Sequence, residues 1–91
     1  MWGVNPRWPR FSAAAAFWRA AVSIPLNIAE GAGKVTQADR RRFHAIARGS
    51  AMACGAILDV IPLLVPLPHD PIAQAKALLV RIVSMLAKMC R

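Results

Sequence analysis

The sequence predicts an all-helical protein, and three observations support that fold class. Apolar residues recur at steps of three and four in three separate stretches, as on one face of a helix. Prolines, glycines and helix-capping residues mark most boundaries between these stretches. No stretch shows the alternation of a β-strand or an Asn-Gly hairpin turn. The 91 residues allow one small domain, predicted at 11–91 after an irregular segment at 1–10.

The first helix is predicted at 11–32, with Gly31 and Gly33 as its stop signals. Pro25 lies inside it, removes one backbone hydrogen bond and disfavours the helical conformation of the residue before it. Two outcomes follow: a kink at Pro25, or a new helix start that Ser23 caps. The expected apolar stripe of this helix contains Val22, Pro25, Ile28, Ala29 and Ala32.

The second helix is predicted at 37–61. Thr36 is its expected N-cap, and Asp39 places an acid in the first turn, where the helix dipole favours negative charge. Gly49 and Ser50 interrupt the apolar pattern, and such small residues allow a neighbouring helix to approach closely. The apolar positions are Phe43, Ile46, Ala47, Cys54, Ile57, Leu58 and Ile61.

The third helix is predicted at 71–90. Three prolines between residues 62 and 68 are expected to end the second helix and to stiffen the link. Asp70 is the expected N-cap, with Pro71 at the first helical position, where its missing amide costs nothing. A heptad seam is formed by Ile72, Ala75, Leu79, Ile82, Leu86 and Met89, and Leu78, Val83, Met85 and Cys90 widen it.

The chain is more apolar than one small domain can easily bury, with 57% hydrophobic residues. The third helix in particular is apolar on more than one side. We therefore expect part of the apolar surface to contact another chain, as in a homo-oligomer.

Cys54 and Cys90 lack the spacing of a disulfide scaffold or a zinc site, which predicts reduced thiols and a cytoplasmic protein. The N-terminal string "FSAAAAFW" loosely resembles a signal peptide, but the run is short and Arg19 follows at once. The most apolar 20-residue window, 49–68, contains Asp59 and three prolines. We expect neither export nor a membrane span.

The formal net charge of +8 is unevenly distributed along the chain. Residues 34–48 and 71–91 each carry +4, whereas the segment between them carries −2. This pattern favours an anionic partner such as nucleic acid, although an ordinary solvated face is the alternative. The candidate binding residues are Arg40, Arg41, Arg42, Arg48, Arg81 and Lys88. Because Phe43 lies on the apolar stripe and tyrosine is absent, contacts to phosphates are expected rather than base stacking.

Nothing in the sequence points to an enzyme, a metal ion or another cofactor. The string "EGAGK" lacks two obligatory positions of a phosphate-binding loop, because Ile28 and Val35 stand where glycine and Ser or Thr are needed. His44 and His69 have no partner at metal-ligand spacing, and we expect both to be solvated. We predict no catalytic residues, since no paired acid, base or nucleophile occurs.

Three strings, "RAAVSIPLNIAEGAGK", "RRFHAIARGSA" and "LLVRIVSMLAKM", resemble the small four-helix-bundle proteins encoded in intervening sequences of bacterial 23S ribosomal RNA genes. Accessory proteins of diversity-generating retroelements are similar to the same group. The resemblance covers Arg19 to Met89. It implies an up-and-down four-helix bundle that forms a ring-shaped homopentamer with a basic, nucleic-acid-binding surface and no enzymatic activity. A reverse transcriptase is a further candidate partner.

Six residues match recurrent positions of that family, and the resemblance implies that they fix helix packing and contacts between bundles. They are Ser23, Asn27, Glu30, Gly31, Gly49 and Ser50. Asn27 and Glu30 lie one helical turn apart and are expected to reach helix or subunit contacts, where a buried acid needs a basic or hydrogen-bonding partner.

The sequence departs from the family pattern at two places. Ala53 stands where the family usually carries a glutamate, so one polar contact is expected to be lost. Only eighteen residues precede Arg19, where the family has a whole helix, so the first helix of the bundle is truncated or missing. Trp2, Trp8 and Phe11 are expected to cover part of the groove, and a truncated copy is the alternative.

The leading functional hypothesis is therefore a homo-oligomeric, nucleic-acid-binding accessory or adaptor protein. The alternative is a structural assembly module whose charge serves solubility. A membrane-active basic amphipathic protein is less favoured, because three prolines separate the second and third helices.

Overall fold

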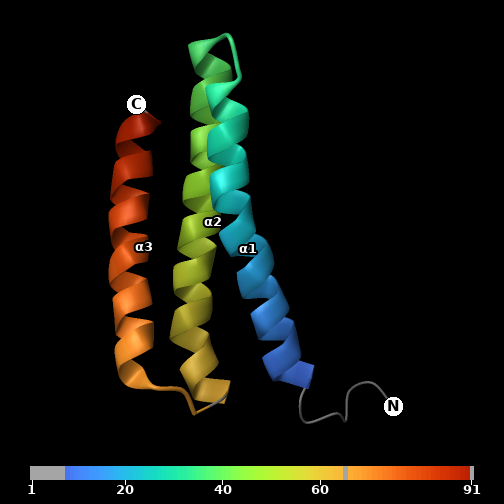
Figure 1. Ribbon diagram of the computed structural model, residues 1–91, viewed down its shortest axis with the longest axis vertical. Helices are drawn as coiled ribbons and strands as arrows, with labels where there is room; N and C mark the ends of the chain where they lie inside the picture. The colour runs from blue at the N-terminus through green and yellow to red at the C-terminus, as the bar shows by residue number, and fades with distance from the viewer. Residues whose placement is uncertain (1–7, 65, 91) are drawn as a thin grey trace.

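The computed structural model describes residues 8–64 and 66–90, which form three antiparallel α-helices and no strand (Figure 1). The helices are α1 (Trp8–Ala32), α2 (Gln37–Leu64) and α3 (His69–Met89). The all-helical prediction is confirmed. A four-helix bundle is not seen in the described part of the chain, and a bundle whose first helix is truncated is compatible with these three helices.

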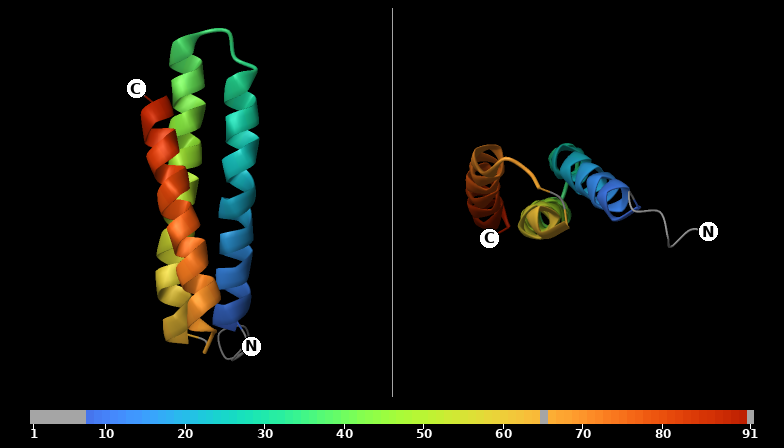
Figure 2. Two further views of the ribbon diagram at one scale, coloured as in Figure 1. Left: turned by 60° about the vertical axis from the view of Figure 1, so that its left-hand side comes forward. Right: turned by 90° about the horizontal axis from the view of Figure 1, so that it is seen from below.

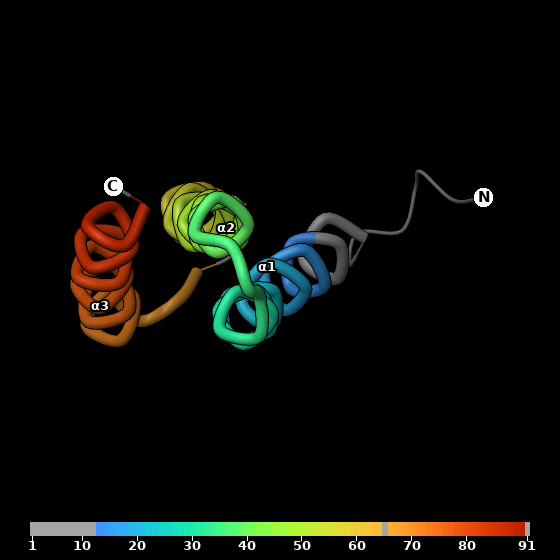
Figure 3. The backbone as a smooth tube through the Cα atoms, turned by 90° about the horizontal axis from the view of Figure 1, so that it is seen from above, coloured from blue at the N-terminus to red at the C-terminus, as the bar shows by residue number. Residues whose placement is uncertain are grey.

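The three helices form an open layer with α2 in the middle. Viewed along the helices, α1 and α3 lie on two sides of α2 and do not close around a common centre (Figures 2 and 3). The molecule measures 48 × 32 × 14 Å, and its radius of gyration is 15.4 Å. A compact domain of this length has a radius of gyration of about 12 Å. The helices therefore leave much of their surface uncovered.

The core follows one stripe of α2. Ala47, Ala51, Cys54 and Leu58 are its buried residues, and each neighbouring helix contributes one further buried apolar side chain, Ile24 from α1 and Leu86 from α3. Small side chains at two of the four α2 positions allow both neighbours to pack closely against a single helix.

Cys54 lies at the centre of this core. Its sulfur is 4.0 Å from the carbonyl oxygen of Phe17, and burial raises the pKa of the thiol, since the charged thiolate is poorly solvated there. Leu79, Ile82 and Val83 of α3 pack against the same cluster. Cys54 and Cys90 are both free thiols.

Helix α1 continues through Pro25 as one helix, so the predicted new start at Ser23 is wrong. The Ser23 hydroxyl instead forms a hydrogen bond of 2.8 Å with the hydroxyl of Ser50 in α2. Asn27 Nδ2 donates to Ser23 Oγ at 2.8 Å and to the Ser23 carbonyl at 2.7 Å. These three polar side chains link α1 to α2 beside the apolar core.

The apolar stripe predicted for α1 coincides only in part with the face that is buried against α2. Pro25, Ala29 and Ala32 are exposed, whereas the residues that pack on α2 are Phe17, Ala20, Ala21, Ile24 and Ile28. Helix α1 is apolar on two faces, and contact with α2 selects one of them. The second face stays uncovered.

The helix ends differ from prediction by a few residues. Helix α1 begins at Trp8, because Pro9 is tolerated in a first turn. Helix α2 continues past Pro62 to Leu64, since residues after a proline can still donate to carbonyls one turn back. Helix α3 begins at His69, so the predicted cap, Asp70, lies inside the first turn and makes no capping bond.

The turn between α1 and α2 is held by backbone and side-chain hydrogen bonds. The Gly33 amide donates to the carbonyl of Glu30 at 3.2 Å and closes α1. The predicted N-cap is confirmed, since the amide of Asp39 donates to Thr36 Oγ1 at 3.2 Å. Arg40 Nη1 reaches back across the turn and donates to the carbonyl oxygens of residues 34 and 35, at 3.0 and 3.2 Å.

Gly31 and Gly49 occupy opposite kinds of environment. No glycine in the described residues has a positive φ, so Gly31 does not end α1 through a left-handed conformation, as the stop signal implied. Gly31 is buried, and a Cβ built there would lie 3.2 Å from the Cβ of Phe43 in α2. A Cβ at Gly49 would meet nothing within 4 Å. Close approach of α1 and α2 therefore depends on Gly31, whereas Gly49 serves no contact within the described chain.

The two glycines predict opposite effects of one substitution. We expect Gly31→Ala to destabilise the protein by about 1 kcal/mol, because the new methyl group forces α1 away from α2. We expect Gly49→Ala to stabilise it by about 0.5–1 kcal/mol through helix propensity alone. Urea unfolding followed by circular dichroism measures both changes. Equal effects at the two positions would contradict this packing.

The turn predicts a difference between two neighbouring arginines. Arg40→Gln removes the guanidinium that bonds two turn carbonyls, and we expect a loss of about 1 kcal/mol in the free energy of unfolding. Arg41→Gln removes an exposed side chain, for which a change within about 0.5 kcal/mol is expected. The same urea titration compares the two variants, and an Arg40→Gln protein as stable as the parent would exclude this role of Arg40.

Candidate nucleic-acid interface

Basic residues that are far apart in the sequence gather toward one end of the molecule. Because α2 and α3 run antiparallel, the N-terminal half of α2 lies beside the C-terminal half of α3, next to the turn between α1 and α2 (Figure 1). Arg41, Arg42 and Arg48 come from α2 and Lys88 comes from α3, whereas Arg81 lies near the middle of α3. We call this region the basic end.

Cations outnumber acids at the basic end, although the four acids are divided equally between the two ends of the molecule. Glu30 lies 3.6 Å from Lys34 as an i,i+4 ion pair, and Asp39 lies in the first turn of α2. The other two acids are at the opposite end of the molecule. There Asp59 forms an ion pair with Lys76, and Asp70 lies 3.4 Å from the imidazole of His69. The basic end therefore has an excess of positive charge because basic side chains from the turn, α2 and α3 gather there.

The predicted binding residues do not all remain available. Arg40 is half-buried and is committed to the turn carbonyls. Arg48 is half-buried. The exposed side chains are Arg41, Arg42, Arg81 and Lys88. These four, with Arg48, form the surface that phosphate groups can reach.

One cation at the basic end, Lys34, was not among the predicted binding residues. The ammonium group of Lys34 lies 5.2 Å from the centre of the Phe43 ring, and the guanidinium group of Arg42 lies 5.4 Å from it. Both are within cation–π range. The contact of Arg42 with Phe43 could be expected from the sequence, because the two residues are adjacent. The contact of Lys34 with Phe43 depends on how the turn folds back.

The prediction that His44 is solvated is wrong. Its Nδ1 atom is buried and has no hydrogen-bond partner among the described residues. The side chain lies against α1, with Nε2 3.4 Å from the position that a Cβ at Gly31 would take. His44 therefore does not share a solvated face with Arg41 and Arg48, because packing at the Gly31 crossing covers it. His69 is exposed, as predicted.

The family positions fall into two groups in this chain. Ser23, Asn27 and Ser50 form the polar link between α1 and α2, and Gly31 permits the close approach of these helices. The Glu30 side chain is 62% exposed and pairs with Lys34 on the surface. An exposed pair of this kind contributes less than about 0.5 kcal/mol, far below the value of a buried acid.

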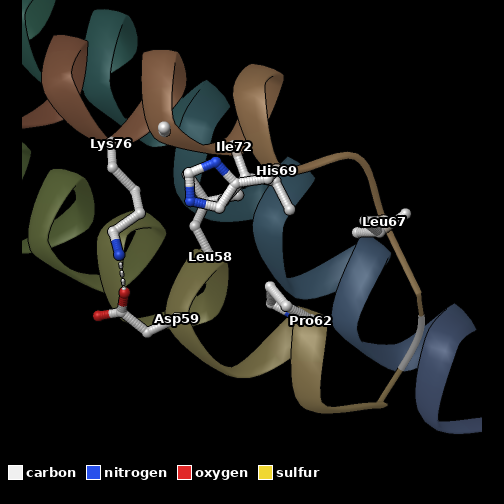
Figure 4. A pocket seen from close by; sticks show the side chains of 8 residues that line it. Leu58, Asp59, Pro62, Leu67, His69, Ile72 and Lys76 are labelled. Atoms are coloured by element: carbon white, nitrogen blue, oxygen red, sulfur yellow. Dashed lines mark ion pairs between the residues drawn. The ribbon is translucent and has the colours of Figure 1, made fainter.

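A cavity of about 400 Å³ lies at the other end of α2 and α3, away from the arginines (Figure 4). Leu58, Leu67 and Ile72 give it apolar walls, and the Asp59–Lys76 ion pair lies at one side. In the described chain no three His, Cys, Asp or Glu side chains come close enough together to hold a metal ion.

Helix α2 is long and apolar enough, by length and composition alone, to cross a membrane. Only 22% of the most apolar window is buried. The core helix of a soluble protein meets the same criterion, and α2 occupies the central position between two other helices.

Comparison with known proteins places the chain in a family. The model of the 23S rRNA-intervening sequence proteins matches residues 5–88, which is most of the chain. Neither the curated proteins nor the solved structures gave a match. The match extends the resemblance seen in the three sequence strings into the N-terminal segment before Arg19. From its helices and from this match, the chain belongs to the 23S rRNA-intervening sequence protein family.

Proposed function

We propose that this protein is a non-enzymatic, self-associating helical protein whose basic end binds the phosphate backbone of nucleic acid. The observation that carries the proposal is the excess of cations near the turn between α1 and α2. Arg41, Arg42 and Lys88 are exposed there, and the cations at this end outnumber its two acids, Glu30 and Asp39. An excess of positive charge attracts a polyanion and orients it.

Backbone contacts fit this surface better than base recognition. Phe43 is the aromatic residue of the basic end, and it is half-buried beneath Lys34 and Arg42. It is therefore poorly placed to stack on a base, whereas exposed arginines and a lysine suit phosphate oxygens. The family description refers to the 23S rRNA intervening sequence and names no ligand, so the proposal of a nucleic-acid ligand rests on the charge of the surface and on the sequence resemblance.

Self-association is supported by the surface that the single chain exposes. Its accessible area is 6560 Å², whereas a compact monomer of this size exposes about 5,200 Å². The excess of about 1,300 Å² exceeds the roughly 800 Å² that each partner buries in a standard interface. Large apolar side chains more than half exposed are Trp18, Leu26, Val35, Met52, Leu63, Leu64, Leu78, Val80 and Met85. Five copies is the number that the family resemblance implies.

The second candidate is a structural assembly module that associates through the same apolar surface and binds no nucleic acid. Insertion of α2 into a membrane is less favoured, because Arg48 and Asp59 interrupt its apolar part and Asp59 is paired with Lys76 of α3. Charged side chains at that depth of a bilayer are costly. A reverse transcriptase as a protein partner stays a prediction from the resemblance.

The proposal predicts binding that weakens steeply with salt. We expect Arg41→Gln/Arg42→Gln to reduce the slope of log affinity against log salt by about 1.8 on duplex DNA, since each lost phosphate contact removes about 0.9. Lys76→Gln removes one cation at the opposite end and should leave the slope unchanged. Fluorescence anisotropy with duplex and single-stranded DNA and RNA, at several salt concentrations, measures the slopes.

Two results would contradict nucleic-acid binding at the basic end. The first is the absence of binding by the parent at low salt, which would favour the structural module. The second is a change of slope in Lys76→Gln that is half of the change in the double variant, which would assign the affinity to the number of charges and not to their position. Substitution of Arg40 is avoided here, because it also disturbs the turn.

A further inference from the structure

Helix α1 carries an aromatic side chain on the face that α2 leaves uncovered. Phe17 packs into the core, and the next residue, Trp18, is 70% exposed. Arg19, the following residue, is also exposed. A large aromatic ring beside an arginine is an arrangement typical of residues that dominate the binding energy of protein interfaces. We call this pair the α1 knob.

A groove of about 450 Å³ runs between α2 and α3. Its walls are apolar, with Met52 from α2 and Val80 and Val83 from α3. Gly55 lines the groove without a side chain to fill it, and a Cβ built there would meet nothing within 4 Å. The groove therefore has an apolar lining and open space above a glycine, as a site for an aromatic ring requires.

The α1 knob and the groove lie at the same height along the helices. The carbonyl oxygen of Phe17 is 4.0 Å from the sulfur of Cys54, so Trp18 is level with Cys54. Gly55, in the groove, directly follows Cys54. The knob lies on α1 and the groove lies between α2 and α3, and α1 and α3 are on two sides of α2 (Figures 2 and 3).

Two unlike patches at equal height, one on α1 and one between α2 and α3, suit a head-to-tail contact between copies. A contact that joins unlike patches repeats from copy to copy and closes into a ring when the rotation allows. If the rotation axis of the ring is parallel to the helices, the ring closes only when successive copies are not shifted along that axis. Patches at equal height meet this condition.

The charges of the two patches are complementary. Asp59 and Lys76 both line the groove and pair through one carboxylate oxygen, which leaves the second oxygen of Asp59, on a side chain that is 59% exposed, for a further cation. Arg19 is next to Trp18 and has no acidic partner within the described chain. Seating the knob in the groove brings Arg19 toward Asp59, and opposite charges in register favour this partner over an uncharged apolar segment.

We propose that the groove between α2 and α3 is covered by a second copy of this chain, with Trp18 of one copy seated over Gly55 of the next and Arg19 beside Asp59. This inference rests on the self-association in the proposed function and names the two surfaces that form it. Divided between the two patches, the excess exposed area gives each about 650 Å², slightly below the roughly 800 Å² that each partner buries in a standard interface.

Two substitutions test the contact from its two sides. Trp18→Ala removes the ring from an exposed position, and Gly55→Leu places a side chain in the groove from a position where a Cβ meets nothing within 4 Å. We expect each to weaken self-association at least about 30-fold, as loss of a dominant interface residue does. Sedimentation velocity over a range of concentrations measures the dissociation constant, and circular dichroism checks that helix content is unchanged.

Gly49→Leu is the matched control. Gly49 also lies in α2, also has nothing within 4 Å of a Cβ, and gains the same helix propensity from leucine, but it does not line the groove. We expect this variant to associate as the parent does. Dissociation by Gly49→Leu together with unchanged association of Gly55→Leu would move the interface to the other face of α2 and overturn the inference.

Mixing the two disrupted variants gives a second test. The knob of the Gly55→Leu protein and the groove of the Trp18→Ala protein are both intact, so the mixture is expected to form pairs of chains that cannot grow further. A mixture that remains monomeric would exclude this seating. A parent that is itself monomeric would overturn self-association as well, whereas a multimeric parent with fully associated variants would overturn only the interface named here.

Discussion

The whole structure depends on helix α2, which packs against α1 on one side and α3 on the other. Helix α2 supplies most of the buried residues, and two of them, Ala47 and Ala51, are alanines with no exposed surface. Small side chains let α1 and α3 come close, but they also bury little apolar area. Each outer helix is therefore held on one side only. The exposed apolar surface, which includes Trp18 and the groove at Gly55, is a direct consequence of this arrangement.

The same arrangement determines where the charges lie. The antiparallel pairing of α2 and α3 places two basic segments side by side, although an acidic segment separates them in the sequence. The apolar groove runs along the middle of the layer, level with Cys54, and Arg41, Arg42 and Lys88 lie nearer the turn between α1 and α2. Association through the groove would thus leave the basic end free in every copy, and a ring would present it several times to one polyanion.

The existence of the helices and the cap at Thr36 could be predicted from the sequence, because local periodicity and local hydrogen bonding determine them. The buried face of α1 could not, since that helix is apolar on two faces and only the crossing at Gly31 selects one. The roles of Arg40 and His44 also depend on how the turn folds back on α1. A pattern of arginines reveals charge but not which side chains the fold uses for itself.

The central claim is that a single chain cannot cover its own apolar surface and that other copies cover it. The melting temperature as a function of protein concentration tests this most directly, because association that stabilises only the folded chain links stability to concentration. The account predicts a melting temperature that rises steadily over a hundredfold increase in concentration. A melting temperature that is independent of concentration, with a cooperative transition at each concentration, would show that the isolated three-helix layer is stable by itself and would contradict it.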